Sequence, residues 1–301
     1  MKNIGFLFGN ERIFSQDVID KINISKLESK RNKVLAEPII IGIVGIYSKS
    51  PSYKKYELIF DRFSNAVPFY HSVLKFLSDS GIKVITSSHS HQIEEELLTL
   101  QMLKANNINV PKIAIIPSKN LPPGVQGDYM QNLQYPLEWD EMFNNVGFPA
   151  DIKSNNSNDL FDTYRVYNKQ EFFHIYDMSD TKTLLYQECF ETGQNIRMFV
   201  VGNKTHYLIY EAHKSLKDRY SIYEEYIDDK TEKNIKHIIG TIKSLFDLDM
   251  FIMDIVIKEK DKVYLLNISL FTMNIDAAQF LPETYNWLVD STAEMLLDLA
   301  K

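Results

Sequence analysis

The hydrophobic positions in the first part of the chain follow two alternating spacings. Short apolar runs rich in β-branched residues predict strands at 2–8, 38–46, 56–63 and 82–88. Between them, residues 15–31 and 67–81 have the pattern of helices, and Gly81 stands at the end of the second, where a left-handed cap is favoured. Strands that alternate with helices predict a parallel sheet covered by helices.

The rest of the chain continues this alternation and then changes to hairpins. The expected elements are a helix at 91–107, strands at 112–118 and 149–154, and a short helix at 138–145. In the first hairpin, Gly202-Asn203 separates two alternating strands, and residues 251–271 form a second hairpin. Between the hairpins, residues 231–247 place their apolar side chains on one helical face, and a further helix closes the chain.

Composition limits the class of protein. The chain has 301 residues, of which 45% are hydrophobic and 24% charged, as in globular proteins and unlike disordered ones. Its 33 basic and 40 acidic residues give a net charge of −7 without a basic block, which disfavours nucleic acid and anionic membrane as partners. No apolar run approaches the ~20 residues of a membrane span, and the single cysteine fits a reducing interior, so we expect a cytoplasmic protein.

The motifs most often found at catalytic and phosphate sites are missing from this sequence. Its 11 glycines form neither GxGxxG nor GxxxxGK, so the common phosphate-binding loops are absent. Gly-x-Ser-x-Gly and HExxH are absent as well, which leaves hydrolysis by a protein nucleophile or by zinc without support.

Several stretches, taken in order, resemble the ATP-grasp superfamily, which includes carboxylate–amine and carboxylate–thiol ligases. They are IGFLFGNE, YELIFDRFSNAVPFY, NVPKIAIIPSK, VGFPADIKS, LLYQECFETGQNIRMFVVGNK and MDIVIKEKDKVYLLNIS. The resemblance implies an α/β plus α+β fold, in which a Rossmann-like N-terminal (pre-ATP-grasp) domain at 1–100 precedes a two-lobed ATP-grasp domain. A central lobe at 101–182 and a C-terminal lobe at 183–301 would clamp a nucleotide between them.

The resemblance also implies which residues would hold ATP. Lys153 matches a lysine that reaches the α- and β-phosphates, and Arg197 matches an arginine directed at the phosphates, so these two are the catalytic candidates. Adenine would lie along a hinge strand at 184–190, and the ribose would lie beside Gln194. The cofactor-binding candidates are Lys112, Lys153, Gln187, Glu188, Cys189, Phe190 and Gln194.

Three of these candidates also have plainer interpretations. Lys153 has the position of a surface lysine at a strand end, and Arg197 that of an outward-facing arginine on a strand. Cys189 has the character of a small buried hydrophobe. The sequence leaves these alternatives open.

The metal site is expected on the last hairpin. The family holds Mg²⁺ with an acid on one strand and an acid-x-Asn pattern on the other. Asp254 supplies the first acid, or is a strand carboxylate facing solvent. YLLNIS places either Asn267 and Ser269, or Leu265 and Asn267, at the second pattern, so one carboxylate is missing in both registers. With Asp254, Asn267 and Ser269 as candidates, we expect a weak or single-ion Mg²⁺ site.

Substrate contacts are expected in the N-terminal domain, because open α/β sheets bind ligands near the carboxyl ends of their strands. The candidates near predicted strand ends are Glu11, Asp61, Arg62 and His71, for which salt bridges and caps are the alternative roles. The expected partners are a small-molecule carboxylate and an amine or thiol, and a homodimer is considered for the assembly.

Three features depart from the family pattern, and each weakens triphosphate binding. Glu96 stands where a second phosphate-binding lysine is usual, although an acid in the first turn of a helix is also favoured by the helix dipole. Residues 154–162 lack the glycines of the usual phosphate flap, and the second metal carboxylate is missing.

Two hypotheses for the function remain. One is a ligase that joins a carboxylate, through an acyl phosphate, to an amine or thiol with ATP and Mg²⁺. The other is a catalytically inactive relative that serves as a binding or partner subunit.

Overall fold

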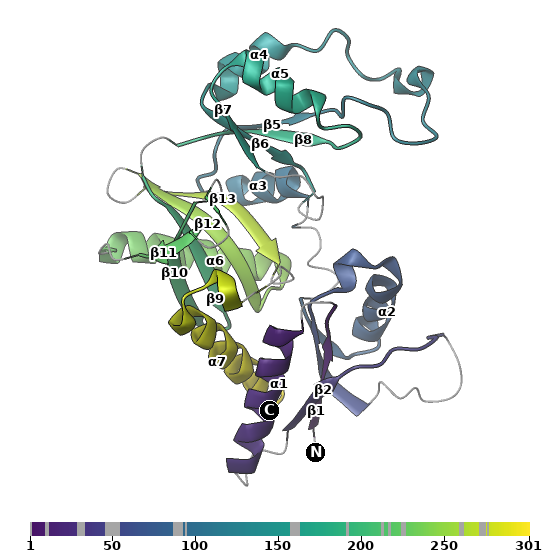
Figure 1. The fold of residues 1–301 in the computed structure, drawn as a ribbon, viewed down its shortest axis with the longest axis vertical. Helices are drawn as coiled ribbons and strands as arrows, with labels where there is room; N and C mark the ends of the chain where they lie inside the picture. The colour runs from purple at the N-terminus through teal and green to yellow at the C-terminus, as the bar shows by residue number, and fades with distance from the viewer. Residues whose placement is uncertain are drawn as a thin grey trace.

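The computed structural model has three sheets, one in each successive region of the chain (Figure 1). The structure describes residues 2–9, 12–28, 34–45, 55–86, 93, 95–156, 163–190, 193–211, 214–215, 218–223, 227–258, 262–270, 275 and 277–301. We name the regions the N-terminal unit (2–85), the central lobe (113–188) and the C-terminal lobe (195–299). Within the described ranges, no helix has the length and apolar character needed to cross a membrane.

The N-terminal unit contains a four-stranded parallel sheet in the order β2-β1-β3-β4. Its elements are β1 (Lys2–Leu7), α1 (Ile13–Glu28), β2 (Val34–Pro38), β3 (Tyr56–Asp61), a short 3-10 turn (Ser64–Ala66), α2 (Pro68–Asp79) and β4 (Lys83–Ile85). Gly81, just after α2, has a φ of +92°, which confirms the predicted left-handed cap. The predicted parallel sheet is confirmed as well.

One predicted strand of this unit is wrong over most of its length. The apolar run at 38–46 predicts a strand, but β2 ends at Pro38 and residues 39–45 have no regular structure. Ile40 and Ile43 are each 92% exposed, whereas Ile39 is buried in the core and Ile41 and Val44 pack against it. The strand forms instead over the preceding residues, where the chain pairs with β1. Hydrophobicity alone does not distinguish a buried strand from an exposed apolar loop.

The central lobe has an antiparallel sheet in the order β5-β8-β6-β7, with two helices on one face (Figure 1). Its elements are β5 (Ile113–Ile116), a 3-10 turn (Gly127–Met130), α4 (Trp139–Val146), β6 (Ala150–Ser154), β7 (Tyr164–Val166), α5 (Lys169–Asp177) and β8 (Leu184–Glu188). The rings of Phe143, Phe172 and Tyr186 meet edge to face, with centroids 4.9 to 5.8 Å apart. This aromatic group gives the lobe a core of its own.

The C-terminal lobe has a five-stranded sheet in the order β11-β10-β9-β12-β13. Its elements are β9 (Asn195–Val201), β10 (Lys204–Tyr210), β11 (Tyr220–Ile222), α6 (Asp229–Phe246), β12 (Met250–Lys258), β13 (Lys262–Leu270), a 3-10 turn (Ala277–Gln279) and α7 (Pro282–Leu299). Successive residues of β9 face opposite sides of the sheet, so Ile196 and Met198 pack with α6, whereas Phe199 and Val201 pack with α7. Gly202 has a φ of +56° in the turn between β9 and β10, which confirms the first predicted hairpin.

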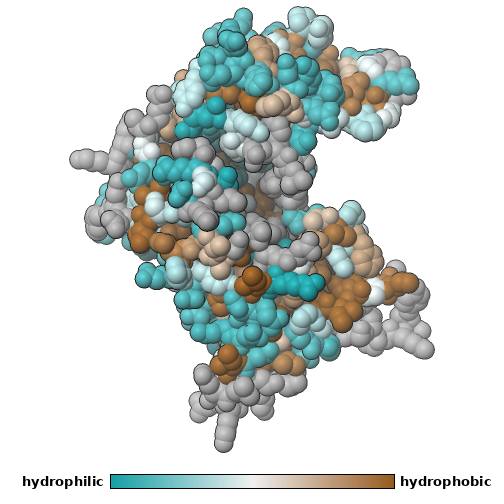
Figure 2. All heavy atoms as spheres, in the orientation of Figure 1, coloured by the Kyte–Doolittle hydropathy of each residue, from teal (hydrophilic) through white to brown (hydrophobic). Residues whose placement is uncertain are grey.

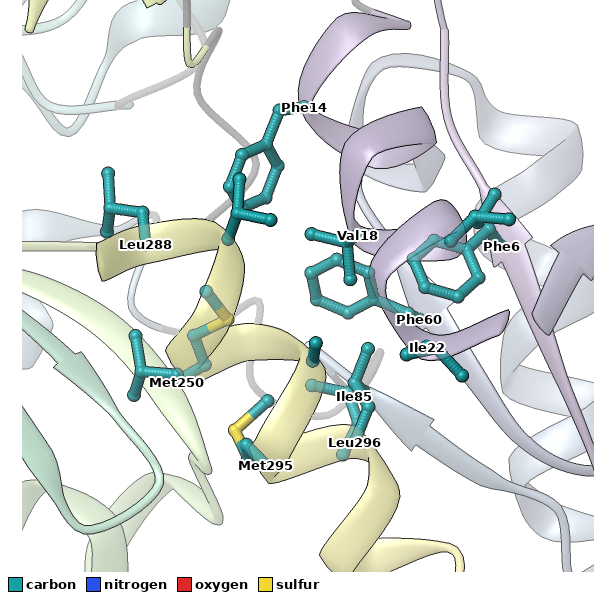
Figure 3. Close-up of a cluster of buried hydrophobic side chains, with 14 of the residues drawn as sticks. Phe6, Phe14, Val18, Ile22, Phe60, Ile85, Met250, Leu288, Met295 and Leu296 are labelled. Atoms are coloured by element: carbon teal, nitrogen blue, oxygen red, sulfur yellow. The ribbon is translucent and has the colours of Figure 1, made fainter. Parts of the chain in front are cut away.

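The N-terminal unit and the C-terminal lobe share one hydrophobic core, although they lie at opposite ends of the chain. Helices α1 and α7 lie side by side, and Figure 3 shows Phe14, Val18 and Ile22 of α1 beside Leu288 and Leu296 of α7. Residues of β1, β3, β9 and β12 belong to the same buried cluster. The burial of these apolar side chains in one shared cluster holds the N-terminal unit against the C-terminal lobe.

Helix α3 (Glu96–Ala105) packs against both the central lobe and the C-terminal lobe. It contacts β5 of the central lobe and β13 of the C-terminal lobe, and Figure 1 shows it between their sheets. Figure 2 shows the molecule hollowed on one side, between the central lobe above and the N-terminal unit below. Residues at the start of α3 and at the ends of nearby strands are therefore placed where several parts of the chain meet.

Candidate functional site

Three polar residues form one row across the C-terminal sheet. Arg197 on β9 lies opposite Asp254 on β12, and Asp254 lies opposite Asn267 on β13. Residues directly opposite each other in antiparallel strands point to the same face of the sheet. Farther along that face, Phe199 and Ile252 belong to the core under α7. The row therefore marks a change from an apolar to a polar surface on one face.

Arg197 and Asp254 form a buried bidentate ion pair. Nε donates to Oδ1 at 2.7 Å and Nη2 donates to Oδ2 at 2.8 Å, and the residues are 7% and 8% exposed. Nη1 donates to the hydroxyl of Tyr220 at 2.9 Å, and the guanidinium carbon lies 3.4 Å from the ring centroid of Tyr210. Burial opposes the charge on Arg197, but the Asp254 carboxylate outweighs it and holds the pKa of Arg197 well above its usual value.

A second buried ion pair joins the central lobe to α3. The ammonium of Lys153 on β6 contacts the carboxylate of Glu96, the first residue of α3, and the two side chains are 14% and 8% exposed. Burial raises the pKa of Glu96, Lys153 lowers it, and the negative charge of Asp254 raises it. Since Asp254 acts on Glu96, the two ion pairs lie within electrostatic reach of each other. We name these four residues the charge cluster.

The backbone fixes Glu96 in this position. Its N–H donates to the carbonyl of Asn155 at 3.2 Å, and the N–H of Leu97 donates to Asn155 Oδ1 at 3.3 Å. Glu95 forms an isolated bridge with Asn156. The end of β6 and the start of α3 are thus hydrogen-bonded together on either side of the Lys153–Glu96 contact.

The hinge strand β8 is tied to both lobes. Gln187 Nε2 donates to the carbonyl of Leu266 on β13 at 3.3 Å, while Gln187 Oε1 is buried and has no hydrogen-bond partner among the described residues. The N–H of Glu188 donates to the carbonyl of Lys112 at 2.8 Å, and that of Cys189 donates to the carbonyl of Pro149 at 3.3 Å. These two amides are therefore already used within the protein.

The observed contacts of the remaining nucleotide candidates are with residues outside the charge cluster. Phe190 packs on Tyr264, with ring centroids 4.7 Å apart, and Gln194 is exposed. Lys112 is exposed and lines a cavity of about 430 Å³ between α3, β5 and α4. Its backbone N–H donates to the carboxylate of Glu188 at 3.0 Å.

The oxygen donors around Asp254 fit one Mg²⁺ ion shared with a phosphate. Asn267 lies directly opposite Asp254, and Ser269 lies two residues along the same strand; both are half-buried. Mg²⁺ is commonly held by one or two carboxylates together with phosphate oxygens and water. Asp254 and Asn267 would supply one carboxylate and one amide oxygen to such a shared ion, and Asp254 would do so with oxygens that also accept hydrogen bonds from Arg197. Within the described residues, no group of three or more His, Cys, Asp or Glu side chains could hold a metal on its own.

Among the substrate candidates, Asp61 and Arg62 have clear structural contacts. Asp61 is fully buried, and its Oδ1 accepts hydrogen bonds from the N–H groups of Phe63 and Ser64 at 3.0 and 2.9 Å. Arg62 is buried, with its guanidinium carbon 4.7 Å from the ring centroid of Phe14. His71 lies half-buried near the start of α2, and Glu11 lies outside the described residues.

Sequence reasoning proposed Lys153, Arg197 and Asp254 as candidates but did not predict the aromatic contacts of Arg197. Tyr210 and Tyr220 are directly opposite each other on β10 and β11, where the sequence contains many tyrosines without a recognisable motif. The only signal for them is their position near a hairpin that carries Arg197. Their role follows from strand pairing, which a single sequence does not show.

Solved structures share this architecture along the whole chain. A RimK-domain ATP-grasp protein from Sphaerobacter thermophilus matches with a TM-score of 0.66 and 13% identity, over 99% of this chain and 98% of its own. D-alanine–D-alanine ligase from Bacillus anthracis, solved with ATP, matches with a TM-score of 0.62 and 14% identity, over 100% and 98% of the two chains. The ATP-grasp ligase PsnB, solved with a minimal precursor, Mg and ADP, matches with a TM-score of 0.57 and 12% identity, over 96% and 98%.

The likeness establishes the class of fold. No protein-family model and no curated protein matches the sequence, and the identities to the solved structures are low. The mixed α/β architecture is nevertheless that of ATP-grasp ligases from one end of the chain to the other. The resemblance that the sequence showed to the ATP-grasp superfamily is therefore confirmed at the level of fold.

Proposed function

We propose that this protein is an ATP-grasp ligase that uses ATP to join a carboxylate, through an acyl phosphate, to an amine or a thiol. One observation carries the proposal. Lys153 of the central lobe is paired with Glu96, and Glu96 lies within electrostatic reach of Asp254, which forms a buried pair with Arg197 in the C-terminal lobe of an ATP-grasp fold. A binding site built from both lobes is what clamping a nucleotide between them requires.

The residues of the site have distinct roles in this proposal. Lys153 and Arg197 offset the negative charge of the phosphates and the charge that develops during transfer. Asp254, with Asn267 and Ser269 beside it, would hold Mg²⁺, which when bound offsets further phosphate charge. The substrate carboxylate attacks the γ-phosphate and ADP leaves, and the amine or thiol then displaces inorganic phosphate from the acyl phosphate. The reaction therefore needs no protein nucleophile.

The hinge strand offers a buried acceptor for adenine. Gln187 Oε1 has no hydrogen-bond partner among the described residues, and a buried acceptor left unpaired costs free energy. The exocyclic amino group of adenine would satisfy it. Glu188, Cys189 and Phe190 would border the same space, while Lys112 and Gln194 stay candidates for contacts at its edge.

We further propose that the chain consists of a Rossmann-like domain at 1–100, a central lobe at 101–182 and a C-terminal lobe at 183–301. The parallel order β2-β1-β3-β4 supports the first of these. Strand β8 begins the third segment in sequence yet completes the sheet of the second, so it connects the two lobes. Glu11, Asp61, Arg62 and His71 remain candidates for contacts with a small-molecule substrate in a cytoplasmic setting.

The first experiment measures nucleotide binding by calorimetry with ATP and ADP, each with Mg²⁺. We expect sub-millimolar binding to the wild type, and loss of about tenfold or more in affinity for Lys153→Ala and for Asp254→Ala, because each removes a charged partner of phosphate or metal. The matched controls are Lys119→Ala and Asp290→Ala, which each remove one member of an exposed ion pair in the same lobes and leave the charge cluster intact.

The second measurement separates the ligase from an inactive relative. ADP release is followed while carboxylates are supplied together with amines or thiols. Release that depends on both substrates supports the ligase. Binding without release for any pair favours the binding or partner subunit. No binding at millimolar nucleotide by a folded wild-type protein would overturn both.

A further inference from the structure

The ammonium of Lys153 is already neutralised by a carboxylate of the protein. Glu96 contacts it, both side chains are nearly buried, and the hydrogen bonds to Asn155 hold the Glu96 backbone in place. A phosphate that approached Lys153 would therefore meet a negative charge beside its intended partner. Asp254, which acts on Glu96 electrostatically, adds a second negative charge nearby, and Arg197 balances Asp254 rather than Glu96.

Like charges in a water-poor site repel strongly, because little solvent screens them. Phosphate can gain Lys153 only if the Glu96 carboxylate moves away or loses part of its contact. The free energy lost when the Lys153–Glu96 contact breaks then reduces the free energy that Lys153 contributes to phosphate binding. The size of this reduction depends on the position of Glu96 against Lys153 as well as on its charge.

We propose that Glu96 competes with the nucleotide phosphates for Lys153 and thereby sets the affinity of the site for nucleotides. This inference rests on the proposed function, because it assigns Lys153 to phosphate. It makes Glu96 a residue that determines affinity and specificity, since the competition acts on phosphate and leaves the base untouched. A nucleoside without phosphate should bind as if Glu96 were absent.

The neighbouring glutamate shows why helix position alone does not explain Glu96. An acid at the start of a helix is favoured by the helix dipole whether it is exposed or buried. Glu95 immediately precedes the helix and is exposed, whereas Glu96 is buried against Lys153. A dipole role requires no buried lysine partner, so the pair itself carries the inference. Glu95→Gln is therefore a matched control for Glu96→Gln.

The test compares ADP with adenosine by calorimetry on the wild type, Glu96→Gln and Glu95→Gln. We expect Glu96→Gln to raise ADP affinity by about tenfold or more, since a charge-assisted contact no longer has to be broken. Adenosine affinity should stay unchanged, and Glu95→Gln should change neither ligand by more than about twofold. Equal ADP affinities in the wild type and a folded Glu96→Gln variant would overturn the competition.

A second comparison shows whether the effect passes through Lys153. In a Lys153→Met background, adding Glu96→Gln should change ADP affinity much less than it does beside Lys153. An equal gain in both backgrounds would show general relief of repulsion, and the inference would be wrong. If Glu96→Gln does not fold, Glu96→Asp replaces it, because the shorter side chain weakens the contact with Lys153. ADP affinity that stays unchanged in a folded Glu96→Asp variant would contradict competition at Lys153.

The outcomes separate this inference from the proposed function. Nucleotide binding that does not respond to Glu96→Gln removes the inference and leaves the ligase proposal standing. ADP binding that appears only after Glu96→Gln supports both. If neither the wild type nor any variant binds ADP or adenosine, both proposals are wrong.

Discussion

Arg197 has each of its three side-chain nitrogens engaged by the protein. Two donate to Asp254 and the third donates to Tyr220, while Tyr210 lies against the guanidinium face. A planar guanidinium held in this way has little freedom to rotate. Phosphate would therefore meet Arg197 in a fixed orientation, and Asp254 would have to share its oxygens between Arg197 and a metal ion.

Removal of the Asp254 charge should destabilise the protein, because it leaves the buried Arg197 without a compensating anion. We expect Asp254→Asn to lower the free energy of unfolding by about 3–5 kcal/mol, as for other broken buried pairs. Denaturation with urea measures this loss. The double variant Asp254→Asn/Arg197→Met should recover part of it, because the unpaired charge is gone. A loss below about 1 kcal/mol for the single variant would show that water or Tyr220 compensates Arg197.

At this scale the sequence offered candidate residues but did not show what they contact. Lys153, Arg197 and Asp254 stand in recognisable stretches, so a resemblance could single them out. Glu96 was singled out only as a departure from the family pattern, and its partner Lys153 lies 57 positions away in sequence. Contacts of this kind depend on how helices and sheets pack, which a single sequence does not specify.

Helix α7 is fixed to the C-terminal sheet partly through a histidine. His206 on β10 forms a hydrogen bond with Thr284 at 3.0 Å, and its ring stacks on Trp287 with centroids 5.0 Å apart. Burial lowers the pKa of His206 below its usual value of 6.5. The folded protein thus resists protonation of this ring more than the unfolded chain does.

The contribution of His206 to stability should depend on pH. With the pKa lowered in the folded state, the contribution is intact above the usual value and is lost as the pH falls below it. We expect the wild type to lose more free energy of unfolding than His206→Gln between about pH 7.5 and about pH 5.5. His237→Gln, an exposed position on α6, is the control. Parallel pH profiles for the wild type and His206→Gln would contradict this expectation.

Elements with a strong periodic signal were predicted well, and elements without one were not. Ile235, Ile238, Ile242 and Phe246 of α6 are buried as their spacing predicts, because one face of the helix packs on the sheet. The apolar run at 38–46 has no such periodicity, and the sequence did not show that residues 39–45 would lack regular structure and bury only some of their side chains. The joining of β8 to the central sheet was also not predictable, since either lobe offers it an edge.

On the scale of the whole molecule, the cores do not follow the order of the chain. The N-terminal unit and the C-terminal lobe share the cluster around α1 and α7, whereas the central lobe has its own aromatic core. The C-terminal lobe also has a second cluster under α6, which includes residues of α3. Segments that share a buried cluster should unfold together, since each loses its packing when the other leaves.

Two core variants test this coupling. Leu288 of α7 and Phe172 of α5 are both fully buried, and substitution by alanine should cost about 2–5 kcal/mol in each case. We expect Leu288→Ala to increase hydrogen exchange in both the N-terminal unit and the C-terminal lobe, as followed by mass spectrometry of peptides. Phe172→Ala should increase exchange in the central lobe alone. Faster exchange confined to α7 in Leu288→Ala would show that the shared core does not couple the two regions.

The hydrogen bonds along β13 also decide how the central lobe is able to move. Asn109 and Gln187, at the two chain crossings into and out of that lobe, both bond to the backbone of β13, and the N–H of Leu265 donates to the carbonyl of Asn109. If the central lobe rotates as a rigid body, these bonds place the axis of rotation along β13. Residues 117–138, which Figure 1 shows reaching outward from the central lobe, would then travel the widest arc for any given rotation.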